Sequence, residues 1–546
     1  MKTNVRILGK FLAAIGTAIF LYSILFHFIM EYEGKQFSWI TGFYWTLTVM
    51  STLGFGDITF TSDLGRLFSM VVLLSGIVFL LIMLPFTFIR FFYAPWLETQ
   101  AQARTPHELP EDTEGHIIMT NYEPIAMGLI GKIDQYELNY VVAVQDTQTA
   151  SELMDMNIRV VIGELDETET YRKLRIEKAA LVFVNNNDML NTNIIATIRE
   201  VSESVPITTI ADTYDSIDIL ELAGATQVFQ FTRMLGITMA QHALGVSARA
   251  NIVGALGGVS IAEAYAAHTP YEEKELIKSG LREKTGVIVV GIWQRGKFDI
   301  PRPETIIHAN SILLLAGSEE HFKSYDEFVG SSRTIEAPVV ILGGGRVGQA
   351  VADTFEELGI NYLVVEKNRH TIKDNDKYIL GDAADIHTLE RAGISAESPS
   401  VLITTRDDDM NIYLTIYCRQ LRPDIQIISR ATSDRNISKL YSVGADIVMS
   451  YASMGANKII NILKPDEILM LAEGLNVFKA SVPASLAGKT LSENQIRRKT
   501  GCNVIAIRSG DSFNVNPDPT VQLKENEELI LIGTAQAEKE FKEALS

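Results

Sequence analysis

Cysteine is nearly absent from this chain of 546 residues, which holds only Cys418 and Cys502. Two cysteines so far apart form neither a Cys-x-x-Cys site nor a disulfide framework, and this usage is typical of a reducing compartment. Basic residues are also in deficit, because 48 lysines and arginines face 67 acidic residues and leave a net charge of −19. A nucleic-acid-binding protein needs a basic surface, so this balance argues against nucleic acid as a partner.

Charged residues are scarce in two long stretches near the N-terminus. Residues 11–30 hold one ionisable side chain, His27, and residues 67–96 form a second apolar stretch. At about 1.5 Å per residue, twenty helical residues span about 30 Å, the thickness of a bilayer core. A secretory signal is the alternative for the first stretch, but the run is long for one and no small-residue cleavage site follows it. Neither stretch carries the repeated arginines of a voltage sensor.

The basic residues that flank the two spans predict their orientation. Lys2, Arg6 and Lys10 precede the first span, and Arg90 lies near the far end of the second. Positive residues favour the cytoplasmic side of a membrane. We therefore expect a multi-pass protein of the cell's inner (plasma) membrane, in contact with the lipid bilayer, with both termini in the cytoplasm.

A glycine-spaced segment lies between the spans at residues 52–57, Thr-Leu-Gly-Phe-Gly-Asp, after a helical run at 38–50. Glycine at alternate positions allows positive φ, so successive carbonyls can point the same way. Four such loops around an axis would form rings of oxygen that replace the water shell of K⁺. A tight turn is the alternative, but the apolar spans on both sides disfavour it. The residues expected to conduct the ion are Thr52, Leu53, Gly54, Phe55 and Gly56.

This segment resembles the selectivity filter of the potassium-channel family, whose usual form is Thr-Val-Gly-Tyr-Gly-Asp. Phe55 replaces a tyrosine whose hydroxyl often braces the filter, which leaves the rigidity of this filter open. The resemblance implies that the second span lines the pore. Gly76 weakens that helix locally and Pro85 removes one backbone hydrogen bond, which predicts a kinked inner helix with the gate near or below Pro85. A static kink is the alternative.

From residue 116 onward, short β-branched runs alternate with helical stretches, as in a parallel α/β sheet. Three blocks repeat in the same order: residues 181–189 resemble 401–410, 222–228 resemble 442–448, and 281–286 resemble 496–501. The predicted fold is an α-helical two-span pore domain followed by α/β, with two tandem Rossmann-like lobes that each precede a small α+β lobe. The expected divisions are the pore domain at 1–97, a linker at 98–114, the first Rossmann-like lobe at 115–248 with its C-terminal lobe at 249–333, and the second Rossmann-like lobe at 336–464 with its C-terminal lobe at 465–546.

The second copy contains a glycine motif in the setting of a dinucleotide-binding loop. The apolar strand 339–342 precedes Gly-Gly-Gly-Arg-Val-Gly, and a helix follows at once. The first glycine of such a motif allows the turn, the second admits a pyrophosphate, and the third lets helix and strand pack closely. Glu366 ends the next strand, where a carboxylate binds ribose hydroxyls and repels a 2′-phosphate, which favours NAD over NADP. The residues expected to bind the nucleotide are Gly343, Gly345, Arg346, Val347, Gly348, Glu366, Lys367, Gly381, Asp382, Ala383 and Thr404.

The first copy departs from this pattern. Residues 120–125, Thr-Asn-Tyr-Glu-Pro-Ile, stand where the glycines would be, and Tyr122 and Pro124 would obstruct a pyrophosphate. We therefore do not expect this lobe to bind a dinucleotide in the usual way. In a nearby acidic block, Glu164 and Asp166 offer the oxygen ligands that Ca²⁺ prefers. A solvated acidic loop is the alternative.

A two-span pore followed by tandem lobes of this kind resembles prokaryotic two-transmembrane potassium channels with two RCK domains (regulators of K⁺ conductance), of the GsuK type. The resemblance implies a homotetramer whose eight RCK domains form a cytoplasmic gating ring. Its implied ligands are NAD(H), adenine nucleotides such as ADP or ATP, and divalent cations. The expected function is thus a K⁺-selective channel whose inner-helix gate is controlled by a bound nucleotide through the linker.

Two other functions use the same Rossmann-like lobes. A regulatory subunit of a K⁺ transporter shares them, but such subunits are soluble and lack a filter. A membrane-anchored NAD-dependent oxidoreductase would need a proton-transfer residue beside the nicotinamide. The sequence shows no group of His, Arg and acidic residues that suggests one, so we do not expect an enzyme.

Overall fold

The structure is a computed structural model that describes residues 2–93, 106–133, 136, 138–243, 249–267, 269–294, 297–309, 311–330, 337–372, 376–394, 398–471, 474–510 and 512–545. The chain divides into two compact units, residues 1–107 with 145–162, and residues 108–144 with 163–546. The expected linker at 98–114 and the expected end of the second span at Trp96 lie partly or wholly outside the described residues.

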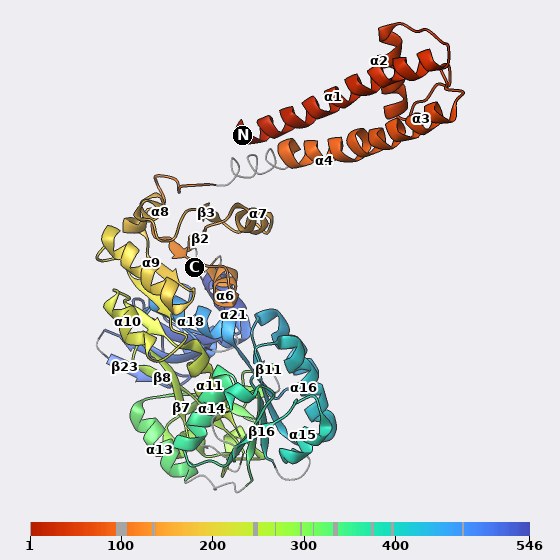
Figure 1. Cartoon of the computed structure of the whole chain (residues 1–546). Coiled ribbons are helices and arrows are strands. Elements are labelled where there is room, and N and C mark those ends of the chain that lie inside the picture. The colour runs from red at the N-terminus through yellow and green to blue at the C-terminus, as the bar shows by residue number, and fades with distance from the viewer. Residues whose placement is uncertain are drawn as a thin grey trace. The chain divides into compact units, whose positions relative to one another are not determined.

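Two long apolar helices form the N-terminal unit, with a short helix and a loop between them (Figure 1). Their apolar stretches, Gly9–Tyr32 and Asp63–Phe91, are long enough to cross a membrane. The short helix begins after Ser38, whose hydroxyl accepts a hydrogen bond from the Thr41 amide. The elements are α1 (Lys2–Tyr32), α2 (Trp39–Met50), α3 (Asp63–Gly76), η1 (Ile77–Met83), α4 (Leu84–Phe88) and η2 (Ile89–Tyr93), and the same unit holds α7 (Thr147–Asp155) and β3 (Val160–Ile162).

The second long helix changes its hydrogen-bond pattern midway. It is α-helical to Gly76, π-helical over η1, and α-helical again from Leu84, with Pro85 at the start of α4. Proline lacks an amide hydrogen, and π-helical turns often occur at such interruptions of the helical ladder. Gly76 keeps ordinary right-handed helical dihedrals. A Cβ added there would lie 2.2 Å from the Met50 carbonyl oxygen. Close packing of α3 on α2 therefore explains this glycine, and its role as a hinge stays a prediction.

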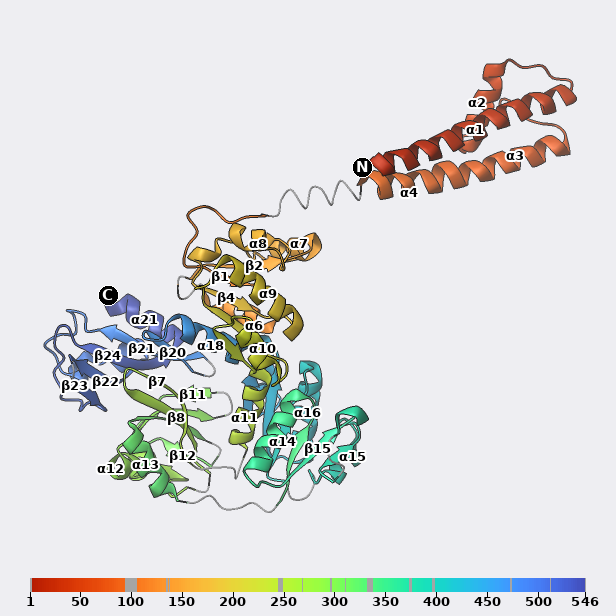
Figure 2. The same cartoon turned by 60° about the vertical axis from the view of Figure 1, so that its left-hand side comes forward.

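The second unit contains two Rossmann-like sheets in tandem (Figures 1 and 2). The first copy consists of β1 (Ile117–Met119), α6 (Pro124–Ile133), β2 (Tyr140–Val144), α8 (Thr168–Lys173), β4 (Leu181–Val184), α9 (Asp188–Val201), β5 (Ile207–Ile210), α10 (Ser216–Leu222), β6 (Gln227–Phe229) and α11 (Phe231–His242). The second consists of β14 (Val339–Leu342), α14 (Arg346–Glu357), β15 (Tyr362–Glu366), β16 (Tyr378–Leu380), α15 (Ile386–Arg391), β17 (Ser400–Ile403), α16 (Asp408–Leu421), β18 (Gln426–Ala431), α17 (Ile437–Ser442), β19 (Ile447–Ser450) and α18 (Tyr451–Leu463).

The strands of both copies run parallel in equivalent orders. The first sheet runs β2-β1-β4-β5-β6, and the second runs β16-β15-β14-β17-β18-β19. Central strands are buried throughout, as expected for a parallel sheet covered on both faces. In each sheet the order reverses beside the first strand, at β1 and at β14, which is where doubly wound sheets bind ligands.

A smaller lobe with an antiparallel sheet follows each Rossmann-like copy. The first consists of β7 (Asn251–Leu256), β8 (Val259–Tyr265), β9 (Lys274–Glu275), α12 (Leu281–Thr285), β10 (Ile288–Gln294), β11 (Lys297–Asp299), β12 (Ile306–Ile307), β13 (Ile312–Gly317) and α13 (Glu319–Val329). The second consists of β20 (Ile468–Met470), β21 (Leu475–Ser481), α19 (Leu491–Asn494), α20 (Ile496–Thr500), β22 (Asn503–Ser509), β23 (Ser512–Val515), β24 (Glu528–Thr534) and α21 (Ala535–Leu545). The two lobes share one core cluster that includes Val259, Leu314, Val477 and Ile530.

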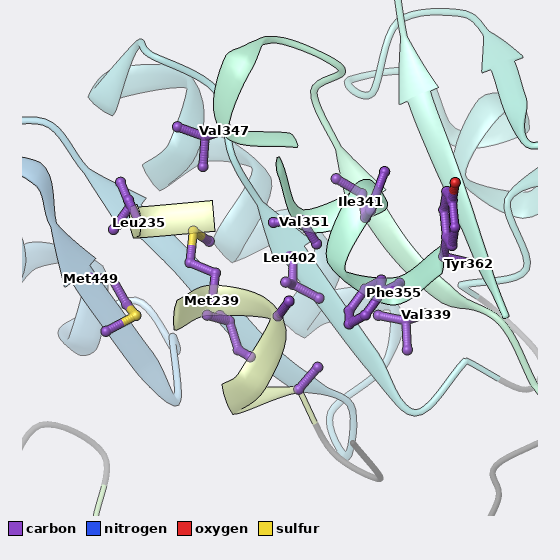
Figure 3. Packing of buried hydrophobic residues seen from close by; sticks show 14 of the residues in the cluster. Leu235, Met239, Val339, Ile341, Val347, Val351, Phe355, Tyr362, Leu402 and Met449 are labelled. Atoms are coloured by element: carbon purple, nitrogen blue, oxygen red, sulfur yellow. The ribbon is translucent and has the colours of Figure 1, made fainter. Parts of the chain in front are cut away.

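The last helix of each Rossmann-like copy packs against the other copy and so joins the two. Helix α11 ends the first copy yet packs on α14 of the second, and α18 ends the second yet packs on α6 of the first. Figure 3 shows Leu235 and Met239 of α11 beside Val347 and Val351 of α14 in one buried cluster. The helices approach closely because a Cβ at Gly236 would lie 2.6 Å from the Ala350 methyl. Residues at the carboxyl ends of both sheets line one cavity.

Candidate functional site

The loop between the two spans has the backbone expected of an ion filter. Thr52, Gly54 and Gly56 have φ of 64°, 41° and 74°, and they alternate with residues of ordinary φ. This alternation turns successive carbonyls toward one side. The Gly54 amide also donates to the Thr48 carbonyl at 3.1 Å, which ties the loop to the end of α2.

Tyr44 braces this loop in a way that the sequence did not predict. Its hydroxyl donates to the Asp57 carboxylate at 3.0 Å. Its ring stacks on Phe55 with 6.5 Å between ring centroids. The hydroxyl that Phe55 lacks is therefore matched by one from α2. Trp45 adds a second tie, because its indole N–H donates to the Ile58 carbonyl at 3.1 Å.

The glycine loop after β14 has the shape of a phosphate cradle. Gly343 has φ of +108°, and a Cβ on Gly348 would lie 1.9 Å from the Gly343 carbonyl oxygen. A Cβ on Gly345 would meet open space, because no heavy atom beyond its neighbours along the chain lies within 4 Å of it. Gly345 precedes α14, and in the described residues no side chain caps this helix. Its first amides and the positive end of the helix dipole are thus available to an anion.

Glu366 lies beside this cradle, at the end of β15. Its carboxylate accepts hydrogen bonds from the Gly344 amide at 2.6 Å and the Asn368 amide at 2.7 Å. Each carboxylate oxygen keeps a further lone pair, so the pair of oxygens fits the two hydroxyls of a ribose. Thr404 supports the loop from β17, because its hydroxyl donates to the Gly343 carbonyl at 2.7 Å.

One cavity of about 820 Å³ joins these groups. All of the predicted nucleotide-binding residues line it except Gly348, which lies behind the loop and supports it. Val347 lines the cavity and also belongs to the buried cluster around α11. The first copy supplies the opposite wall with residues that sequence reasoning missed, namely Asn121, Glu123, Pro124, Asn185, Asn186, Asn187, Leu190, Ile210, Asp212 and Thr232. The Arg346 guanidinium donates to the Asp212 carboxylate and so links the two walls.

In the first copy a carboxylate occupies the place that a phosphate would take. Glu123 Oε1 accepts hydrogen bonds from the amides of Ile125 at 3.1 Å and Ala126 at 3.3 Å, at the start of α6. The Asn185 side chain donates to the same oxygen at 3.2 Å. Burial is the main cause that raises the pKa of Glu123. The helix is therefore capped from within. That this lobe does not bind a dinucleotide in the usual way stays a prediction.

The calcium hypothesis gains no geometric support. Among the residues that the structure describes, no three His, Cys, Asp or Glu side chains converge as a metal site. Ca²⁺ usually takes six to eight oxygen ligands, which Glu164 and Asp166 alone do not supply. A calcium site at these two residues remains a prediction.

Comparisons with known proteins match this architecture in order along the chain. An ion-channel family model matches residues 11–93, a TrkA-N domain model matches 117–231 and 339–451, and a TrkA-C domain model matches 264–330 and 477–546. The doubled matches confirm the duplication, and the predicted fold class is confirmed. The protein class is thus a membrane ion channel with tandem regulatory domains.

Individual relatives narrow this class. The probable potassium channel protein 2 of Methanocaldococcus jannaschii is 27% identical over 244 residues, which cover 41% of this chain and 71% of that protein. The solved GsuK channel bound to NAD is 35% identical, with a TM-score of 0.61, and the match covers 100% of this chain and 99% of that one. The solved GsuK RCK domain is 32% identical over 83% of this chain and 99% of that chain, with a TM-score of 0.59. The chain belongs to the GsuK family of potassium channels with tandem RCK domains.

Proposed function

We propose that this chain forms a homotetrameric, ligand-gated K⁺ channel whose RCK domains bind an adenine nucleotide, NAD or ADP/ATP, in the cavity between the two Rossmann-like lobes. Thr52 to Gly56 supply the filter, and the glycine loop with Glu366 and Asp382 holds the nucleotide. Both termini lie in the cytoplasm of a cell whose plasma membrane carries the pore. The inner helix closes near Pro85, and residues 98–114 transmit the change.

The observation that carries this proposal is the uncapped start of α14 inside the shared cavity. Gly345 leaves room for a pyrophosphate, and Glu366 lies across from it with acceptors suited to a ribose. A 35% identical relative of nearly equal length was solved bound to NAD. Adenine nucleotides carry both the ribose and the pyrophosphate that these residues fit.

The position of the cavity suggests how a ligand controls the pore. Only a ligand that binds one conformation better than another shifts the balance between them. A phosphate at the start of α14 meets Arg346, whose present partner is Asp212 of the other lobe. The nucleotide therefore acts on a contact between the lobes. A change in that contact then reaches the inner helices through the linker.

The test is K⁺ flux from liposomes that contain the full-length channel, with and without NAD or ADP, for the wild type and for Gly345→Asp. We expect nucleotide to change the flux through the wild type at least several-fold and to leave Gly345→Asp unaffected, because a carboxylate would occupy the phosphate position. Basal flux of the variant serves as the control for an intact pore. Wild-type flux that ignores every adenine nucleotide would refute the gating site while leaving the channel.

A further inference from the structure

A buried arginine lies at the far end of the cavity from Glu366. Arg430, near the end of β18, is only 6% exposed, lines the cavity, and has no hydrogen-bond partner on its Nε among the described residues. Its guanidinium carbon lies 5.6 Å from the centroid of the Tyr451 ring. Burial lowers the pKa of this arginine. The charge of Asp408 and the Tyr451 ring offset part of that cost, but the unpartnered Nε leaves this buried guanidinium able to bind a further anion.

Comparison of the two copies gives an independent argument. The side-chain amide of Asn411 donates to the Arg430 carbonyl at 2.9 Å, as Asn191 donates to the Ile210 carbonyl at 3.0 Å, so Arg430 and Ile210 are equivalent positions. By the same alignment of the repeated blocks, Arg406 stands where the first copy has Asn186. Both pairs of positions line the cavity. The second copy has therefore placed positive charge where the first has an apolar and a neutral polar side chain.

The strand order of the second sheet indicates which part of a bound nucleotide Arg406 and Arg430 would reach. Glu366 ends β15 and the glycine loop follows β14, whereas Arg406 lies in the loop after β17 and Arg430 lies in β18, on the opposite side of β14. Neighbouring strands lie about 4.8 Å apart, so β18 is about 10 Å from β14 and within reach of a long side chain. A ligand with its ribose on Glu366 and its first phosphates at Gly345 extends its remaining atoms toward Arg430. In a dinucleotide those atoms are an uncharged ribose and a base, whereas in a nucleoside triphosphate they are a further phosphate.

We propose that Arg430, with Arg406, is a specificity-determining anion subsite that favours nucleotides whose phosphate chain ends in a free phosphate over dinucleotides. This inference rests on the proposed function, because it assumes that a nucleotide occupies this cavity. Charge-assisted hydrogen bonds to a terminal phosphate would complete the partners of the buried guanidinium. The esterified pyrophosphate of NAD presents less charge and no free end to this subsite.

The test is a calorimetric titration of the full-length channel in detergent with ATP, ADP and NAD, without divalent cations. We expect the wild type to bind ATP more tightly than NAD, and Arg430→Met to weaken ATP at least tenfold while changing NAD less than threefold. Arg430→Lys should restore part of the ATP affinity. Arg435→Met is the matched control, because this exposed arginine lies outside the cavity lining and its loss removes the same charge.

The possible results distinguish failure of the proposed anion subsite from failure of the proposed nucleotide site. Equal weakening of ATP and NAD by Arg430→Met, or no weakening of either, would overturn the subsite and leave the proposed function standing. Failure of the wild type to bind any of the three nucleotides would overturn both. The melting temperature of the ligand-free Arg430→Met channel should stay equal or rise, since a buried charge is removed. If Arg430→Met fails to assemble, Arg406→Met takes its place in the test and should likewise weaken ATP binding more than NAD binding.

Discussion

The two Rossmann-like lobes share a scaffold and differ in the loop that would meet a ligand. In the first copy Arg199 donates to the Gly224 carbonyl at 2.9 Å, and in the second Arg419 donates to the Gly444 carbonyl at 3.1 Å. Such matched hydrogen bonds hold equivalent turns at the same sheet edge. The duplication has therefore kept the groups that build the fold.

The start of the first helix shows what has changed. Helix α14 begins after Gly345 with no side-chain cap in the described residues, whereas α6 begins beside Glu123, whose carboxylate accepts from its first amides. A helix start that carries its own anion has no place for a phosphate. The first copy has become a wall of the cavity in the second. The lobe proposed to bind nucleotide and the lobe that supports it thus differ by a few residues of one loop.

The largest expected effect comes from changing side-chain size at one pair of equivalent positions, Gly348 in the second copy and Ile125 in the first. Gly348→Ala puts a methyl where the Gly343 carbonyl oxygen lies 1.9 Å away, which should cost about 1–3 kcal/mol of stability and distort the cradle. Ile125 is fully buried, so Ile125→Ala should cost about 2–5 kcal/mol. Thermal unfolding measures the loss of stability in both variants, and nucleotide titration shows which variant also loses nucleotide binding.

The two variants should differ in nucleotide binding. Gly348→Ala is expected to abolish nucleotide binding, since the loop that it displaces forms the cradle. Ile125→Ala should retain binding at a temperature where it is still folded, because Ile125 packs on Gly455 of α18, away from the loop. Retained binding in Gly348→Ala would show that the cradle does not need this close approach of helix and strand.

A second test copies the carboxylate of the first lobe into the second. Arg346→Glu places an acid at the start of α14, where Glu123 stands at the start of α6. We expect nucleotide affinity to fall about 100-fold, or about 2.8 kcal/mol at 1.4 kcal/mol per tenfold, because an anion would then oppose the phosphate. Titration with ADP measures this change.

Asp212→Asn is the matched control for that test. It removes the ion pair with Arg346 from the other side and keeps the arginine. Both side chains of this pair are about half exposed, so its contribution to stability should be at most about 1 kcal/mol. ADP affinity should change less than threefold or rise. An equal loss in both variants would mean that the ion pair, and not the charge at the helix start, governs binding.

Much of the second lobe could be predicted from sequence because its signals are local. The turn after β14 needs glycine at fixed spacing, and Glu366 follows at the end of the next strand. The filter is equally local, since its geometry depends on alternate residues of one loop. In each case neighbours along the chain determine the backbone, so spacing alone carries the information.

The shared cavity could not be predicted, because it depends on packing between distant segments. The exchange of α11 and α18 relies on contacts such as Gly236 with Ala350, which no local pattern records. Arg430 was missed because it lies inside a buried strand and has no motif around it. Alignment of the two copies would have shown it, because its equivalent is Ile210. The hydrogen bond from Tyr44 to Asp57 could not be predicted either, because it depends on how the loop folds.

The smallest expected effect concerns the pH dependence that Glu123 gives the first lobe. Burial raises the pKa of this carboxyl in the folded chain above its ordinary value, although hydrogen bonds from Ile125 and Asn185 oppose the rise. The folded state then binds the proton more tightly than the unfolded state does. The stabilisation is fully present below the unfolded pKa and is lost as pH rises through the folded pKa.

Glu123→Gln removes this titration and keeps an oxygen that can cap α6, so the two proteins should differ by no more than about 1 kcal/mol at low pH. As pH rises toward neutrality, the wild type should lose stability relative to the variant. Thermal unfolding of both full-length channels between pH 4 and pH 8 gives the difference curve. A flat difference curve, or one of opposite slope, would show that ionisation of the Glu123 carboxyl does not destabilise the fold. The start of α6 would then hold an anion as readily as the start of α14 is proposed to hold a phosphate.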